Sequence, residues 1–292
     1  RSVTSDGDIS GNAGSRGSAS AEAKASAVGG KEDDSSSTAD DHGVDDNTAA
    51  GRNTGNAAAA SGGARDSAAG TATPTASTAS TDTGESGGAK TVSVAAAVAV
   101  NVTDSTSRAR LTGAAINAGG NVSVRSSANT DASAKADGSA TTKGDEGDAS
   151  VGAAVAINVA NLTNEAVVGG TTAISAEGLT LAATMTDDAG DLTHTTQADA
   201  KSGAGGGKVG VAGSVAINVV NEDTRAVLQA GASASLAGGD LRVQVASTSD
   251  DTVRAKPEGD GAAGSDVGVG ASVAVNVVDR NLAAELADGA AT

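Results

Sequence analysis

The segment VAGSVAINVVN at residues 211–221 decides the fold, because it alternates valine or isoleucine with small or amide side chains. Three further copies are AAAVAVNVTD at 95–104, GAAVAINVAN at 152–161 and GASVAVNVVD at 270–279. A two-residue period with β-branched side chains on one face indicates a β-strand, since a helix would spread both sets of side chains around its circumference. Each copy therefore predicts one strand.

Each strand copy carries one asparagine at the same place, and these asparagines define a repeat: Asn101, Asn158, Asn218 and Asn276. Subtraction gives spacings of 57, 60 and 58 residues, which is typical of a long-period repeat array. An aliphatic residue ten positions later predicts a second, short strand: Leu111, Val168, Leu228 and Leu286. A glycine corner such as AGGN at 118–121 then precedes a third strand, which opens at Val122, Leu179 or Leu241.

The chain is therefore predicted to be all-β and to form a parallel β-helix, or β-solenoid, from repeats of about 58 residues. One unit has too little apolar surface to fold alone, so we expect units to stack and to bury their valine and leucine columns. We expect the opposite face, made of small side chains, to pack against a second sheet of the same unit or of a neighbouring chain.

A charge column favours one large coil per repeat. Stacking in register would place the carboxylate of Glu165 between the guanidinium groups of Arg108 and Arg225. An exposed pair of this kind contributes only about 0 to 1 kcal/mol, so the column indicates register more than stability. Two or three narrow rungs in each repeat remain the alternative.

The repeat also predicts the organisation of the chain. Residues 1–27 match the third-strand region of a partial repeat, and 28–90 are a low-complexity insert rich in serine, glycine, alanine and aspartate, which we expect to be mobile. Repeats follow at 91–150, 151–208 and 209–266, and a partial repeat occupies 267–292. The sequence begins and ends inside a repeat, so we expect it to be a section of a longer protein.

Composition excludes several classes of partner. The chain has 292 residues, no aromatic residue, no cysteine and a formal net charge of −17, so nucleic acid and anionic membranes, which require a cationic face, are not expected to bind. The longest apolar run, at 92–102, is too short for a membrane helix. Transmembrane barrels carry aromatic girdles that this chain lacks, so we expect no membrane insertion.

Two recurrent polar columns are candidate sites. The four asparagines could bind a ligand, but stacked asparagines more often form an amide ladder along a solenoid, and we favour the ladder. Nine residues into the third strand lie Asp131, Asp188 and Asp250. Stacked carboxylates repel one another, and calcium with its oxygen ligands would relieve this; the alternative is a solvated acidic face.

Catalysis has few candidate residues. The two histidines, His42 and His194, have no recurrent partners, and serine and aspartate are too abundant for any triad match to be specific. We therefore predict neither an enzyme nor a cofactor, apart from possible calcium.

The valine–alanine strand ending in VN, the short strand, the GG[DN][VL]xV corner and the aspartate- and glycine-rich loop together resemble the repeat regions of very large bacterial surface proteins. These are the filamentous-haemagglutinin-like and leukotoxin-like exoproteins, and the resemblance covers roughly 92–292 and the first 27 residues. It implies export to the cell surface, a parallel β-helix and a structural role in a fibre or adhesin stalk, with self-association or further repeats as partners. A glycan- or protein-binding adhesin segment that uses its acidic loops is the second hypothesis, and a polysaccharide-active enzyme is the third.

Overall fold

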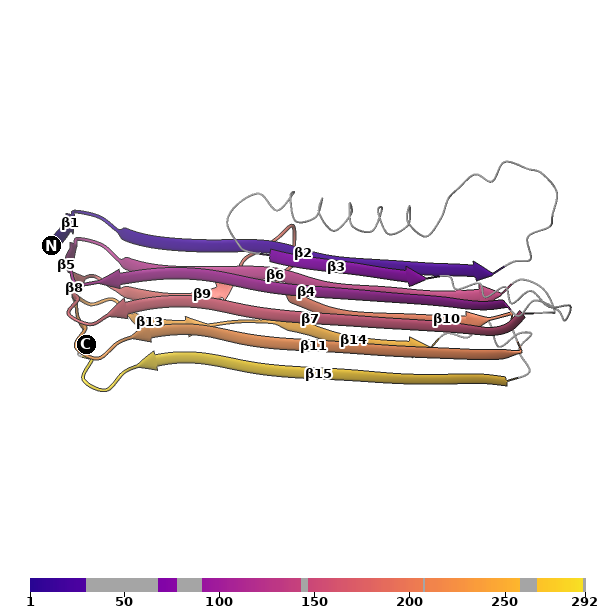
Figure 1. Ribbon diagram of the computed structural model, residues 1–292. Coiled ribbons are helices and arrows are strands. Elements are labelled where there is room, and N and C mark those ends of the chain that lie inside the picture. The colour runs from indigo at the N-terminus through magenta and orange to yellow at the C-terminus, as the bar shows by residue number, and fades with distance from the viewer. Residues whose placement is uncertain (30–67, 78–90, 143–146, 207, 258–266, 291–292) are drawn as a thin grey trace, which may run out of the picture.

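The computed structural model describes residues 1–29, 68–77, 91–142, 147–206, 208–257 and 267–290, and the described chain is all-β (Figure 1). No helix occurs in these ranges, and hence none that could cross a membrane. The prediction of an all-β chain with parallel strands is confirmed. Most of the insert predicted at 28–90 lies outside the described residues, as do the loops at 143–146 and 258–266.

The strands form three sheets, which we call A, B and C. Sheet A contains four short strands in the order β1 (Ser2–Ser5), β5 (Ala115–Ala118), β8 (Ala173–Ala176) and β12 (Ser233–Leu236). Sheet B contains β13 (Leu241–Val245), β9 (Leu179–Met185), β6 (Val122–Thr142), β10 (His194–Gly205) and β14 (Ser249–Pro257), with β2 (Ile9–Gly29) paired to β6. Sheet C contains β15 (Val267–Leu286), β11 (Val209–Leu228), β7 (Gly147–Gly169), β4 (Thr91–Thr112) and β3 (Ala68–Ser77).

The chain visits these sheets in a fixed order. After β4 in sheet C come β5 in sheet A and β6 in sheet B, and the order C, A, B recurs from β7 and again from β11. All pairs between the described strands are parallel except β3 with β4, which is antiparallel. Strands β7, β11 and β15 pair over twenty consecutive positions without a shift, and Asn158, Asn218 and Asn276 lie side by side.

The interior changes in width along the strands. Near sheet A, where all three sheets meet, large aliphatic side chains such as Ile116, Leu181 and Leu228 are buried together. Farther along, sheets B and C face each other directly across a layer of alanines from β2, β4, β6, β7, β10 and β11. A Cβ atom on Gly152 would overlap the carbonyl oxygen of Gly203, so the two sheet backbones meet there and only glycine fits.

The burial prediction for the valine strands is wrong in one respect. Val168 and Leu228, near the corner, are fully buried as expected. In the long strands of sheet C, however, the alanine, serine and asparagine face is buried, whereas Val98, Val215 and their register partners point outward and are half-buried or exposed. Sheets B and C lie too close together for valine, so the small-residue face packs inside the unit, one of the two places expected for it.

Candidate functional site

The recurrent asparagines form a continuous ladder in sheet C, which is buried except at Asn276. Asn101 Nδ2 donates to Asn158 Oδ1 at 2.7 Å, Asn158 Nδ2 to Asn218 Oδ1 at 2.8 Å, and Asn218 Nδ2 to Asn276 Oδ1 at 3.0 Å. The first three asparagines are completely inaccessible to solvent. Because their amides are occupied by one another and by Thr103 and Thr196, they act as structural groups and leave little capacity to hold a ligand.

The ladder has a direction, and its two ends differ. At the β4 end, the buried Oδ1 of Asn101 has no hydrogen-bond partner among the described residues, and the residue opposite it on β3 is Gly70. At the β15 end, Asn276 Nδ2 donates to the carbonyl oxygen of Asp251 at 3.1 Å. Each amide directs its acceptor towards β4 and its donor towards β15, so the same hydrogen bond can repeat with every equivalent unit added to the stack.

The charge column is assembled on the outer face of sheet C. Arg108 Nε lies 2.8 Å from one oxygen of Glu165, and Arg225 Nη2 lies 2.5 Å from the other. The side chain of Glu165 is only 9% exposed, so this carboxylate is shielded more than those of ordinary surface pairs. Its hydrogen bond raises the pKa of Arg225 above the ordinary value, and Asp223 contributes in the same direction.

The structure does not bring the three predicted calcium-binding aspartates together. Thr195, rather than Asp188, stands between Asp131 and Asp250: its N–H donates to Asp131 Oδ1 at 3.0 Å, and it pairs with Asp250. Asp188 is displaced into a short hairpin at residues 186–193, where it lies 3.9 Å from Arg16. In the part of the chain that is described, no three metal-ligating side chains gather into a cluster.

A seven-residue insertion causes this displacement. Ala128 pairs with Met185 before the hairpin, and Ala132 pairs with Thr196 after it, so four residues of β6 oppose eleven residues of the next unit. Positive φ angles at Ala189 and Gly190 close the hairpin, and the DAGD sequence at 188–191 is the signal that could have predicted it. The predicted aspartate column assumed equal spacing along each strand, and such an assumption does not detect an insertion.

Sequence reasoning missed a second polar group, in which the buried His194 and Glu222 are accompanied by Arg280 at the surface. His194 is 1% exposed, and its Nδ1 accepts a hydrogen bond from the Thr130 N–H at 2.9 Å. Burial lowers the pKa of His194 below its ordinary value of 6.5, against the opposing effect of the Glu222 carboxylate. The Glu222 side chain is fully buried and accepts a hydrogen bond from Arg280 Nε at 2.7 Å. His42 lies outside the described residues.

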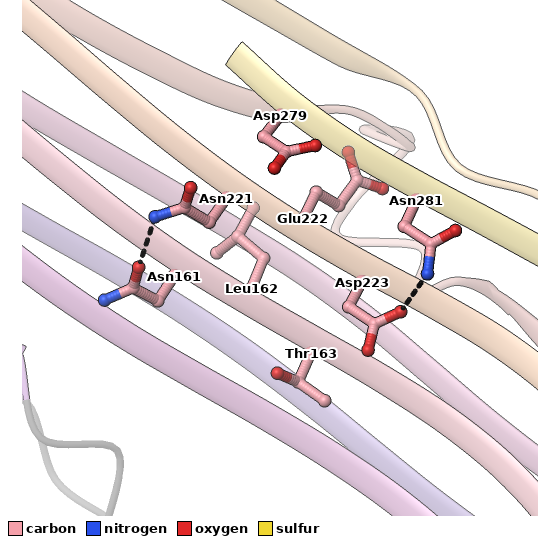
Figure 2. A pocket seen from close by; sticks show the side chains of 8 residues that line it. All are labelled: Asn161, Leu162, Thr163, Asn221, Glu222, Asp223, Asp279 and Asn281. Carbon is pink, nitrogen blue, oxygen red and sulfur yellow. Dashed lines mark hydrogen bonds between the residues drawn. The ribbon is translucent and has the colours of Figure 1, made fainter. Parts of the chain in front are cut away.

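A shallow hollow of about 220 Å³ lies on the outer face of sheet C, beside the charge column (Figure 2). Its wall includes two further ladders: Asn221 Nδ2 donates to Asn161 Oδ1 at 2.9 Å, and Asn281 Nδ2 donates to Asp223 Oδ1 at 3.0 Å. The carboxylate of Asp279 adds one more charge. These outer amides donate towards β4, opposite to the buried ladder, and because they bond to one another the hollow is polar but its groups are largely occupied.

The most distinctive surface is the valine face, defined as the outward positions of sheet C within 94–102, 151–159, 211–219 and 269–277, which are in register. All twenty are valine, isoleucine, alanine or glycine, and none is buried. The outward positions of sheet B are instead polar and charged, including Lys135, Asp199 and Arg254. Comparison of the chain with known protein families, curated proteins and solved structures finds no match.

Proposed function

We propose that this chain is a structural section of an extracellular bacterial fibre or adhesin stalk, built as a parallel β-helix with one coil per repeat. The recurring order of sheets C, A and B supports this architecture, because a chain that returns to the same sheet after each repeat stacks each unit on the preceding one. The observation that carries the proposal is the unshifted pairing of β7, β11 and β15 over twenty positions.

The chemistry of the chain supports a mechanical role. Its recurrent polar side chains bond to their own copies along the stack, as the asparagine ladder and the Arg108–Glu165–Arg225 column do. Groups used in this way stiffen the stack and are not free for substrate or ligand. Placement outside the cell rests on the resemblance to exported bacterial surface proteins, and a chain without cysteine is compatible with it.

The dimensions give this fibre a particular shape. A strand of twenty residues is about 66 Å long, whereas four stacked strands occupy only about 19 Å at the usual strand spacing. The described section is therefore a broad slab (Figure 1). A longer stack of such coils would be a flat tape of constant width that lengthens by about 4.8 Å with each repeat.

Duplication of one repeat tests the proposal. A chain in which residues 209–266 are present twice, one copy directly after the other, should keep its width of about 66 Å and gain about 4.8 Å along the stacking axis, as measured by small-angle X-ray scattering and electron microscopy. Several narrow rungs in each repeat would add two or three times that increment. If the second copy instead formed a separate particle joined by a linker and not aligned with the stacking axis, the stack would be contradicted.

A further inference from the structure

The valine face lacks the features of a surface that remains in water. Exposed strands usually carry threonine, lysine or glutamate on the wet side, as sheet B does here. The valine face carries no side chain that can donate or accept a hydrogen bond at any of its twenty positions. On the outermost strand, Val269 and Val273 are 55% and 54% exposed. A contiguous aliphatic patch of this kind marks an interaction surface.

The relief of the valine face is regular. One small-residue column runs across all four strands through Ala96, Ala153, Gly213 and Ala271. Valine columns flank it on both sides, one of which contains Val98, Val155, Val215 and Val273. A Cβ atom on Gly213 would meet no atom within 4 Å, so the floor of this channel is open. The face therefore carries one channel between valine ridges, and both run parallel to the stacking axis.

The size of the face suits a pair of copies. Nine residues of strand and four strands give a footprint of about 550 Å² at ordinary strand rise and spacing. Two such faces together bury about 1,100 Å², which is just above the roughly 1,000 Å² that a specific interface requires. Each additional repeat would add about 140 Å² to each face, so association strengthens with the length of the stack.

We propose that the valine face is a lateral docking surface for a second copy of this chain, packed face to face so that the valine columns of one copy enter the small-residue channel of the other. This inference rests on the proposed stack and names the surface by which two such stacks pair. The partner must be flat, aliphatic and ridged at strand spacing, and the same chain presents such a surface. A face-to-face pair is closed and isologous, and on each copy the polar residues that border the face, Asp104, Asn161, Asn221 and Asp279, remain in water.

The charge of the chain predicts how association depends on salt. Each copy carries a formal net charge of −17, so two copies repel one another until salt screens them. Association through an aliphatic face should therefore strengthen as sodium chloride is added, whereas association through ion pairs would weaken.

Sedimentation velocity on the whole chain tests the proposal with two variants of equal charge. Val155→Lys with Val215→Lys places two ammonium groups on adjacent strands of the valine face, whereas Ser133→Lys with Gln197→Lys does the same on adjacent strands of sheet B. We expect the wild type and the sheet B variant to form dimers at about 100 µM. We expect the valine-face variant to dimerise at least about tenfold more weakly, because lysine cannot be desolvated there without cost.

Folding is controlled separately. The thermal unfolding of all three proteins in dilute solution should be similar, and Val155→Thr with Val215→Thr provides an isosteric substitution if the lysine variant fails to fold. A wild type that stays monomeric at about 100 µM in high salt would overturn the proposal, as would equal dimerisation of the two lysine variants. Binding of monomers to phosphatidylcholine vesicles would also overturn it, by assigning the face to lipid. An unchanged stack in a monomeric wild type would refute the lateral pairing and leave the proposed fibre standing.

Discussion

The two broad sheets share one interior but present opposite chemistry to their surroundings. The outward-facing side chains of sheet B are mainly serine, threonine, aspartate and lysine, whereas those of sheet C are mainly valine and isoleucine over its four parallel strands. Inside, both contribute alanine to the same thin layer. Size, rather than hydrophobicity, therefore decides which side chains lie between these sheets, and the larger apolar side chains are left on the outside of sheet C.

The sharpest test of this difference compares two glycines of sheet C. Gly152→Ala places a Cβ atom against the carbonyl of Gly203, so the sheets must separate, and we expect the free energy of unfolding to fall by about 3 kcal/mol. Gly213→Ala adds the same atom to the open outer channel and should be neutral or stabilising by up to about 1 kcal/mol. Urea unfolding measures both; equal losses would contradict the close approach of the sheets.

The inner and outer amide ladders offer the next comparison. Asn158→Asp replaces the donor amide by a carboxylate, which leaves the buried Oδ1 atom of Asn218 without its donor from β7 and buries a charge, so we expect a loss of about 2 to 3 kcal/mol. Asn161→Asp makes the same change in the outer ladder, where water can replace the lost bond, and should cost less than about 1 kcal/mol. Equivalent denaturation midpoints for the two variants would place Asn158 in contact with solvent.

The charge column should respond to salt. Glu165→Arg aligns three guanidinium groups, and we expect a loss of about 2 kcal/mol at low ionic strength that shrinks as salt is added. Glu165→Gln removes the attraction without adding repulsion, so its loss should be smaller and less dependent on salt. Thermal unfolding at two salt concentrations checks this; stability unaffected by Glu165→Arg at low salt would argue against stacking in register.

The next comparison is between a valine in the core and a valine on the valine face. Val168 is fully buried near the corner, and Val168→Thr places a hydroxyl there without a partner, which should cost about 1 to 2 kcal/mol. Val215 is half-buried on the outer face, and Val215→Thr should cost less than about 0.5 kcal/mol in dilute solution. If Val215→Thr lowered the free energy of unfolding of the monomer by more than this, the Val215 side chain would have to lie in the core.

The smallest effect concerns His194 in the shared interior. Burial lowers its pKa in the folded protein, so the unfolded chain binds a proton first as the pH falls through about 6.5. The free energy of unfolding should therefore decrease between pH 7 and pH 5, and His194→Gln should make that decrease shallower. Denaturant titrations at the two pH values compare the variants, and parallel pH profiles would mean that His194 is not buried in its neutral form.

Much of the architecture follows from the sequence because the asparagine and its flanking alternation recur at nearly equal spacing. Counting from Asn158 and Asn218 aligns the strands of sheet C over their whole length and pairs Glu165 with both arginines. The same counting fails at Asp188, because a seven-residue insertion, folded into the hairpin at 186–193, interrupts sheet B in one of the described units. The alternation also does not predict which face of a strand is buried. That depends on how closely sheet B packs against sheet C, which leaves room for Ala216 but not for Val215.

The central claim is that each repeat contributes one strand to sheet C, directly above its copy. The chain has no cysteine, so spin labels can be attached at Thr163→Cys with Asp223→Cys, which are adjacent in register, and at Thr106→Cys with Asp223→Cys, which are two strands apart. With labelled chains diluted in unlabelled protein, electron paramagnetic resonance should show strong spin exchange at about 4.8 Å for the first pair and weaker coupling at about 9.6 Å for the second. Separation of the first pair by about 10 Å or more would mean that other rungs lie between the repeats and would contradict the stack.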